Sequence, residues 1–230
     1  MASPIRILSS MATKPLLADL IEKFEQTSAA RVTVESVGGV AALKRVQADE
    51  AFDIVCLAAN VIDQLTTEGK IVAGSRADLV KSGVAVAVRT GAPRVDLSSE
   101  ESVKAAVLAA ATVGYSTGPS GVYLTKLFER WGIADQIKDR IVLAPPGVPV
   151  GSLMVKGEVE LGFQQLSELM NIPGIDILGP LPDAIQLITV FSAGIATTST
   201  QPDAARELLA FLVSDEATAI KRANGMEAAG

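Results

Sequence analysis

Short apolar runs alternate with amphipathic stretches along most of the chain. In the interval 13–26, for example, apolar residues recur at helical spacing, which predicts a helix with one buried face. The apolar runs predict β-strands at residues 5–9, 31–37, 53–57, 83–89, 112–115, 140–144, 159–163, 175–178 and 187–196. Strands that alternate with helices indicate βαβ units and an α/β fold with mainly parallel sheets.

Two of these strands differ from the others, since glycines and polar residues flank the segments 84–89 and 188–195. A molecule of two lobes, crossed by the chain in two extended segments, explains this pattern simply. We therefore expect lobe one to contain residues 1–85 plus 197–230, and lobe two to contain residues 86–196. A single sheet is the alternative that the pattern leaves open.

Composition narrows the classes of function. The 230 residues carry a net charge of −6 and no basic cluster, which argues against nucleic-acid binding. The apolar runs are too short to insert in a membrane. The chain has no histidine, so a His-dependent triad or zinc site is excluded, and we expect no cofactor and no metal. The single cysteine, Cys56, lies in an apolar run and is expected to be buried and inert.

The first residues lead directly into the first predicted strand, without the basic segment and long apolar core of a signal peptide. We expect a cytoplasmic protein if Met1 is the natural start, and a periplasmic one if a signal peptide was removed.

A junction between a strand and a helix at residues 115–121 carries the strongest functional signal. The loop is rich in Gly, Ser and Thr, and the helix is predicted to open near Pro119 or Ser120. Such a junction directs free backbone N–H groups, the positive end of a helix dipole and hydroxyl groups at one spot, which suits a small anion. The alternative is an ordinary capped helix after a tight loop.

Two junctions near the N-terminus have a similar design. Ser9 and Ser10 end the first predicted strand, and Gly38 and Gly39 follow the second. In open α/β sheets, ligands bind outside the carboxyl ends of the strands, so these loops are candidates for the same site. The competing interpretation is that the two serines only cap the first helix, and the sequence does not decide between the two.

The arrangement resembles the type II periplasmic-binding-protein fold, in particular the molybdate-binding-like branch of solute-binding proteins. The motifs that carry the resemblance span the chain: IRILSSM at 5–11, VGG at 37–39, FDIVCLA at 52–58, YSTGPSG at 115–121, KGEVELGF at 156–163 and AGI at 193–195. Where molybdate-binding relatives carry a hydroxyl residue in the second loop, this chain has Gly38-Gly39-Val40, with Ser36 slightly earlier.

The resemblance implies a small anion, either an oxyanion or a small carboxylate, held between two lobes. It also implies an ABC transporter as partner if the protein is exported. Residues from the predicted loops are expected to bind the anion: Ser9, Ser10, Gly39, Ser116, Thr117, Ser120, Gly121, Val150 and Gln164. Lys14 and Arg45 are the cationic residues nearest the lobe-one loops. One of them could pair with a ligand that carries two or three carboxylates, but solvated helix charges are the simpler interpretation of both.

Relatives on this fold also include the aconitate isomerases, which suggests a second function: an isomerase of a small unsaturated polycarboxylate. That reaction needs a base, an acid and donors that stabilise an enolate-like charge. The sequence places no carboxylate clearly in a predicted ligand loop. A binding protein needs no base, and we therefore expect binding ahead of isomerisation.

Overall fold

A computed structural model describes residues 3–229, and the chain divides into two compact units, Met1–Ser82 with Val190–Gly230 and Gly83–Thr189. The chain passes between the units twice, within β4 (Ala77–Arg89) and within β9 (Ile188–Ile195). The mixed α/β architecture expected from the sequence is confirmed.

The boundaries of the units differ from the expected lobes at both crossings, and at the first crossing residues 83–85, expected in lobe one, belong to unit 2. Residues 190–196 were expected in lobe two, but they belong to unit 1 because β9 pairs antiparallel with β3 from Phe191 to Ile195. The first crossing strand, β4, is also longer than expected. It begins at Ala77 rather than at residue 83, and its residues Val80 and Lys81 pair with β10 in unit 1.

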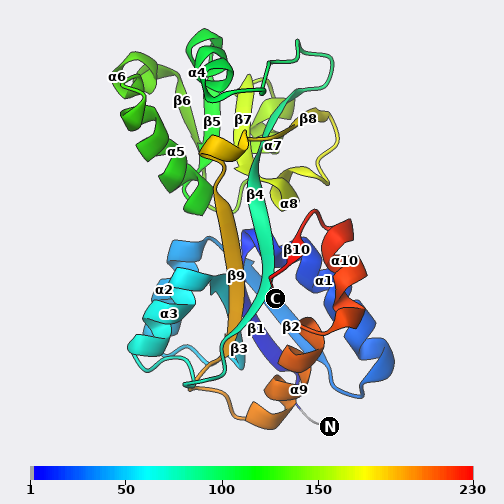
Figure 1. The fold of residues 1–230 in the computed structure, drawn as a ribbon. Coiled ribbons are helices and arrows are strands. Elements are labelled where there is room, and N and C mark those ends of the chain that lie inside the picture. The colour runs from blue at the N-terminus through cyan, green and yellow to red at the C-terminus, as the bar shows by residue number, and fades with distance from the viewer. Residues whose placement is uncertain (1–2, 230) are drawn as a thin grey trace. The chain divides into compact units, whose positions relative to one another are not determined.

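Unit 1 is built on three parallel strands in the order β2-β1-β3, extended by the antiparallel strand β9. Apart from the crossing strands β4 and β9, the elements of unit 1 are, in sequence order, β1 (Ile5–Ser10), α1 (Lys14–Thr27), β2 (Val32–Val37), α2 (Gly39–Gln47), β3 (Ile54–Ala58), α3 (Ala59–Thr67), α9 (Pro202–Leu212), α10 (Thr218–Ala223) and β10 (Glu227–Ala228). In Figure 1, α2 and α3 cover one face of this sheet, and α1 and α10 lie on the other side.

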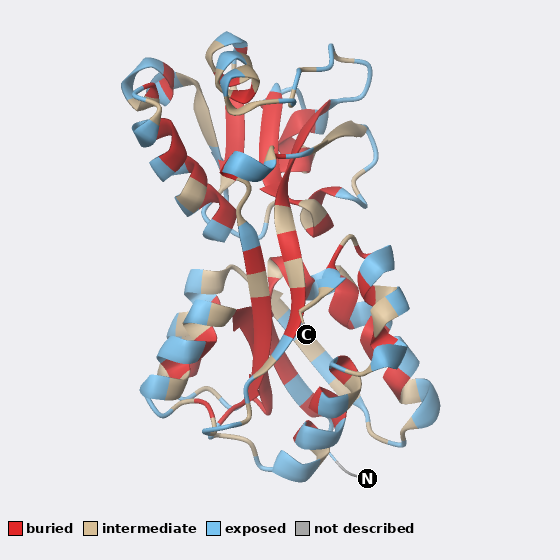
Figure 2. Ribbon diagram, viewed as in Figure 1, coloured by how far each residue is buried: buried red, intermediate tan, exposed pale blue. Residues whose placement is uncertain are grey.

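Alternating residues of the unit 1 strands build two separate cores. Ile7 and Ile54 pack with the apolar faces of α1 and α9, whereas Leu8 and Val55 pack with α2 and α3. This alternation follows from the two-residue period of a strand, which sends successive side chains to opposite faces. Figure 2 shows the result, with buried strands in the middle and exposed outer faces on the helices.

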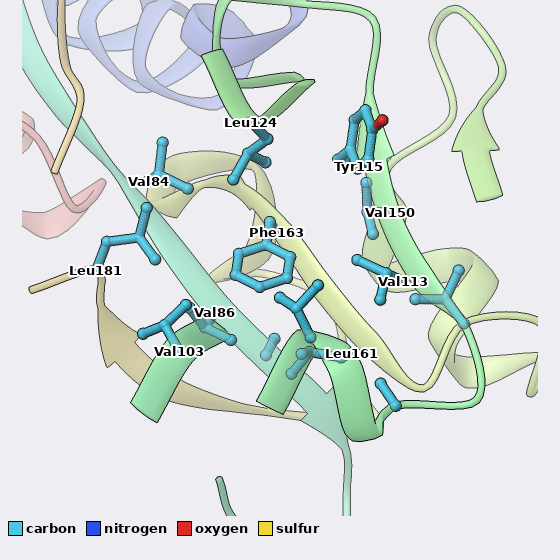
Figure 3. Close-up of a cluster of buried hydrophobic side chains, with 14 of the residues drawn as sticks. Val84, Val86, Val103, Val113, Tyr115, Leu124, Val150, Leu161, Phe163 and Leu181 are labelled. Carbon is cyan, nitrogen blue, oxygen red and sulfur yellow. The ribbon is translucent and has the colours of Figure 1, made fainter. Parts of the chain in front are cut away.

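Unit 2 repeats the plan with the parallel strands β6-β5-β7, beside which β4 runs antiparallel to β7 and β8 runs antiparallel to β4. Its elements are α4 (Glu100–Ala109), β5 (Val113–Ser116), α5 (Pro119–Arg130), α6 (Ala134–Ile137), β6 (Ile141–Ala144), α7 (Val150–Val155), β7 (Leu161–Gln165), α8 (Leu166–Leu169) and β8 (Ile175–Pro180). A single core fills the unit, and Figure 3 shows the ring of Phe163 within it, near Leu124, Val84 and Leu161.

The helices of residues 3–229 are each too short or too polar to cross a lipid bilayer.

Candidate functional site

The carboxyl ends of the three parallel strands of unit 2 lie at one edge of its sheet. Ser116, the last residue of β5, is in register with Ala144, the last residue of β6, and Tyr115 is in register with Phe163 of β7. The segments that leave this edge carry the loop 116–121, the start of α7 and the residues from Gln164 onward. The structure therefore brings the predicted unit 2 residues to one edge, which we call the unit 2 edge.

The loop 116–121 is packed tightly against the helix that follows it. The N–H of Gly118 donates a weak hydrogen bond to Ser116 Oγ at 3.4 Å. A Cβ atom on Gly121 would lie 1.6 Å from the carbonyl oxygen of Ser116, so this position admits glycine alone. Ser116 is half-buried, Thr117 is exposed and Ser120 is buried.

The helix α5 begins at Pro119, as the sequence predicts, but its cap differs from the expected one. Gly118 is the N-cap residue, and no side chain caps the helix there. Ser120 lies instead within the first turn, where the N–H groups of the helix N-terminus have no partner within the helix. Ser120 is therefore not the cap of α5, and the role of the junction in anion binding stays a prediction.

A chain of hydrogen bonds links three other residues of the unit 2 edge. The backbone N–H of Val150, at the start of α7, donates to Gln164 Oε1 at 2.8 Å. The amide group Nε2 of Gln164 then donates to Glu168 Oε2 at 2.7 Å. Gln164 is buried, whereas Glu168 is half-buried on the short helix α8. The amide of Val150, expected to be a ligand donor, is thus already engaged by Gln164.

Glu168 is the functional candidate that the sequence interpretation missed. Burial raises the pKa of its carboxyl to about 7, and the hydrogen bond from Gln164 only partly opposes this rise. A carboxyl group with such a pKa can both take up and release a proton at neutral pH. The sequence does contain one indication of Glu168, namely its position four residues after Gln164. This spacing places the two side chains side by side if a helical turn follows the strand.

In unit 1, the carboxyl ends of β1, β2 and β3 form the corresponding edge, which we call the unit 1 edge. Ser9 is fully buried, and its Oγ lies 2.7 Å from Ser36 Oγ, across the register pair of β1 and β2. Ser10 Oγ lies 3.4 Å from Thr13 Oγ1. Gly39 opens α2 after the N-cap residue Gly38, and there is open space where its side chain would be.

The structure decides one question that the sequence left open about the two serines. Ser10 precedes the 3-10 turn Met11–Thr13 that leads into α1, but its side chain makes no capping hydrogen bond. The hydroxyl of Ser9 is shared with Ser36 and the carbonyl oxygen of Ser10. The interpretation that these serines cap the first helix is therefore wrong, and their role in ligand binding stays a prediction.

Arg45 is engaged by other residues of unit 1. Its guanidinium donates to Glu50 at 2.7 Å through Nε and to Glu35 at 2.8 Å through Nη2, and it stacks over the ring of Phe52 with 5.2 Å to the centroid. Lys14 is exposed in the first turn of α1. The positive charge of Arg45 is thus balanced by two carboxylates within the protein.

Cys56 lies in the middle of β3 and is fully buried. Burial raises the pKa of its thiol to about 12, while the nearby hydroxyl of Thr13 acts weakly in the other direction. The thiol is therefore protonated at neutral pH, and the expectation of an inert cysteine agrees with its surroundings.

An open hollow of about 780 Å³ lies elsewhere on unit 2, between the segments 97–101 and 178–184. Its lining includes the acidic residues Glu100, Glu101 and Asp183 and contains none of the candidate residues. This lining is unsuited to an anion, and we place the candidate site at the strand edges on chemical grounds.

Solved structures share this fold over nearly the whole chain. The Azotobacter vinelandii periplasmic molybdate-binding protein matches with a TM-score of 0.81 and 18% identity, over 96% of this chain and 98% of that one. The tungstate ABC transporter from Geobacter sulfurreducens matches with a TM-score of 0.74 and 18% identity, over 95% of this chain and 97% of that one. These likenesses define the chain as a protein of the periplasmic-binding-protein fold.

Sequence comparison gives the family. The model of the bacterial extracellular solute-binding proteins matches residues 5–227, and the chain belongs to this family. An aconitate isomerase from Pseudomonas sp is 34% identical over 231 aligned positions, which cover 97% of this chain and 87% of that protein.

Proposed function

We propose that the protein is a solute-binding protein of the molybdate-binding-like type, which captures a small anion with donor loops at the carboxyl ends of its parallel strands. The observation that carries the proposal is the design of the two strand edges. Each edge places hydroxyl groups and the start of a helix at the carboxyl ends of parallel strands, where ligands of open α/β sheets bind.

The donors proposed to bind the anion are neutral. Several preorganised N–H and O–H groups stabilise an oxyanion without a paired cation, because they are fixed before the ligand arrives. In unit 1 we assign this role to Ser9, Ser10 and Gly39. In unit 2 we assign it to Ser116, Thr117, Ser120 and Gly121, beside which Gln164 holds the N–H of Val150. The family supports a solute as ligand, and the fold relatives named for molybdate and tungstate support an oxyanion or a small carboxylate.

A transporter is the partner that this function implies, since solute-binding proteins deliver ligands to ABC transporters. This role requires an exported protein, which agrees with the extracellular assignment of the family.

A second candidate function is the isomerisation of a small unsaturated polycarboxylate. Two observations favour it: the 34% identity to an aconitate isomerase and the carboxyl group of Glu168 at the unit 2 edge. The same donors would serve both functions, because an enolate-like charge needs the same stabilisation as an oxyanion.

The test of the common site is the double variant Ser10→Ala with Ser120→Ala, which removes one hydroxyl from each edge. We expect the affinity for the best anion to fall at least tenfold in titration calorimetry, because hydrogen bonds to a charged group are the strong ones. Molybdate, tungstate, sulfate, phosphate and di- and tricarboxylates are screened first by thermal shift, since a ligand that binds the native state stabilises it.

The matched control replaces one exposed hydroxyl residue in each unit, Thr67→Ala with Ser98→Ala. Affinity in the control should equal that of the unchanged protein. An unchanged affinity in the folded Ser10→Ala and Ser120→Ala variant would remove the proposed site.

A further inference from the structure

The unit 2 edge holds a carboxyl group that anion binding does not require. Glu168 follows the carboxyl end of β7 by three residues, and its position is fixed by the hydrogen bond from Gln164, whose own carbonyl group is held by the N–H of Val150. A carboxylate in a site for anions repels its ligand unless it is protonated or takes part in the chemistry. Anion binding alone therefore does not explain why this carboxyl group lies at the unit 2 edge.

We propose that Glu168 is the group that moves the proton in a 1,3-proton shift on an unsaturated polycarboxylate, with Gln164 as its positioning residue. This assignment rests on the second candidate function, and it adds the base that the isomerisation needs.

The proposed step balances without a co-reactant. The carboxylate of Glu168 takes a proton from the methylene carbon next to the C=C bond. The electron pair of that C–H bond forms the new C=C bond, while the pair of the old one moves onto the far carbon and its carboxylate as an enolate-like charge. The protonated Glu168 then returns its proton to the far carbon. One C–H bond breaks and one forms, and nothing is oxidised or reduced.

The environment of Glu168 suits this task. Burial raises the pKa of its carboxyl to about 7, so both protonation states are populated near neutral pH, where a general base works best. Gln164 donates to one oxygen of the carboxyl, Oε2. The neighbouring elements β7 and α7 carry no charged residue within their bounds, and the nearest along the chain are Glu160, just before β7, and Lys156, just after α7.

Three other groups among residues 3–229, namely Cys56, Asp53 and Tyr123, are unsuitable as the base for identifiable reasons. The thiol of Cys56 is fully buried and stays protonated. The carboxylate of Asp53 lies at the amino end of β3 and accepts hydrogen bonds from Arg6, Ser199 and Gln201. Tyr123 donates its hydroxyl to the carbonyl oxygen of Ile185, and burial raises its pKa above the ordinary value for tyrosine.

The experiment uses cis- and trans-aconitate as probes with the full chain in D₂O, followed by proton NMR. The unchanged protein should interconvert the two acids and introduce deuterium at the exchanging carbons. Glu168→Gln should lose at least 100-fold in rate, because an amide cannot accept the proton. Glu168→Asp should retain part of the activity. In the unchanged protein, kcat/KM should rise with pH through an apparent pKa near 7, and this rise should vanish in the residual activity of Glu168→Gln.

Glu158→Gln is the matched control, since Glu158 is an exposed glutamate of the same unit, and its rate should stay unchanged. Calorimetry with trans-aconitate separates folding and binding from chemistry, because Glu168→Gln should still bind the acid.

Two outcomes would overturn the assignment in different ways. A Glu168→Gln rate within threefold of the unchanged protein would remove the role of Glu168 and leave the isomerase function standing. Binding of aconitate by the unchanged protein without conversion or deuterium uptake would remove the isomerase function, and the role of Glu168 with it, while anion binding would stand.

Discussion

The two units follow one plan but place their carboxyl groups at opposite ends of the strands. In unit 1, Asp53 precedes β3, at the amino end of the parallel strands. In unit 2, Glu168 follows β7, at the carboxyl end. Burial alone would raise the pKa of Asp53, but hydrogen bonds from the N–H of Arg6 and from the side chains of Ser199 and Gln201 outweigh it and hold the pKa below its ordinary value.

Glu168 shows the opposite balance, because burial dominates the single hydrogen bond from Gln164 and raises the pKa to about 7. The same scaffold therefore stabilises an ionised carboxylate where it ties segments together, and disfavours the ionised form at the candidate site. The number of hydrogen bonds, rather than burial alone, therefore decides the direction in which the pKa of each carboxyl group is shifted.

The largest expected loss of stability is at Gly121 of the unit 2 edge, and Gly39 of the unit 1 edge is the comparison. In Gly121→Ala, the new methyl group would meet the carbonyl oxygen of Ser116, so the loop 116–121 must move and the free energy of unfolding should fall by about 3 kcal/mol. In Gly39→Ala, the new group enters open space at the start of α2, and stability should change by less than about 1 kcal/mol. Urea unfolding measures both. Equal losses would show that the two edges are packed alike.

A second prediction concerns the ionised carboxylate of unit 1. Asp53→Asn exchanges two acceptor oxygens for one acceptor and a donor, which leaves hydrogen-bond partners unsatisfied and should cost about 2 kcal/mol at pH 7. Because the pKa of Asp53 is lowered in the folded state, its contribution is present above the unfolded pKa and is lost as pH falls through the folded pKa. The unchanged protein should therefore lose stability more steeply below pH 4 than the variant does. Parallel acid profiles of urea stability for the two proteins would contradict this.

The third prediction has the opposite sign and belongs to unit 2. The folded pKa of Glu168 is raised to about 7 from the ordinary value of 4.5, so ionisation in the folded state costs stability. The contribution of Glu168 to stability is therefore fully present below pH 4.5, where its carboxyl is protonated, and it is lost as pH rises towards 7. Glu168→Gln should remove this loss, and its stability relative to the unchanged protein should increase by on the order of 2 kcal/mol between pH 4.5 and pH 8.

The measurement is urea unfolding across that pH range, with Glu158→Gln as the control that should show no such increase. The stability of each variant relative to the unchanged protein should change with pH in opposite directions for Glu168→Gln and Asp53→Asn. If both change in the same direction, the contrast between the two carboxyl groups is wrong.

Much of the fold could be predicted from the sequence, because the apolar runs and the helical spacing are strong, local signals. The start of α5 at Pro119 was predicted, and so was the first strand, which extends by one residue to Ser10. The strand expected at 159–163 lies instead at Leu161–Gln165. Val159 is buried against Gly114 rather than paired in the strand, and this packing is not visible in a local pattern.

That shift of two residues explains why Glu168 was missed. It moves Gln164 and Gln165 into the end of β7, so that Glu168 comes to the strand edge on a helix of four residues. A helix so short has no apolar period to reveal it. The pKa of the carboxyl depends on burial by distant segments, which sequence spacing does not contain. The residue types of the loops were predictable, whereas the protonation state of the site was not.

The smallest expected effect is that of replacing Arg45, and this substitution tests whether the unit 1 edge has a cationic ligand group. Arg45 is paired with Glu35 and Glu50 and stacks on Phe52, and such partly exposed pairs contribute little to stability. Arg45→Gln should therefore lower the free energy of unfolding by less than about 1 kcal/mol and change the affinity for a tricarboxylate by less than twofold. Calorimetry at low and high salt measures the affinity, with the exposed Arg31→Gln as control. A tenfold loss of affinity confined to Arg45→Gln would identify the guanidinium as a ligand group. The unit 1 edge would then no longer differ from the unit 2 edge by having only neutral ligand groups.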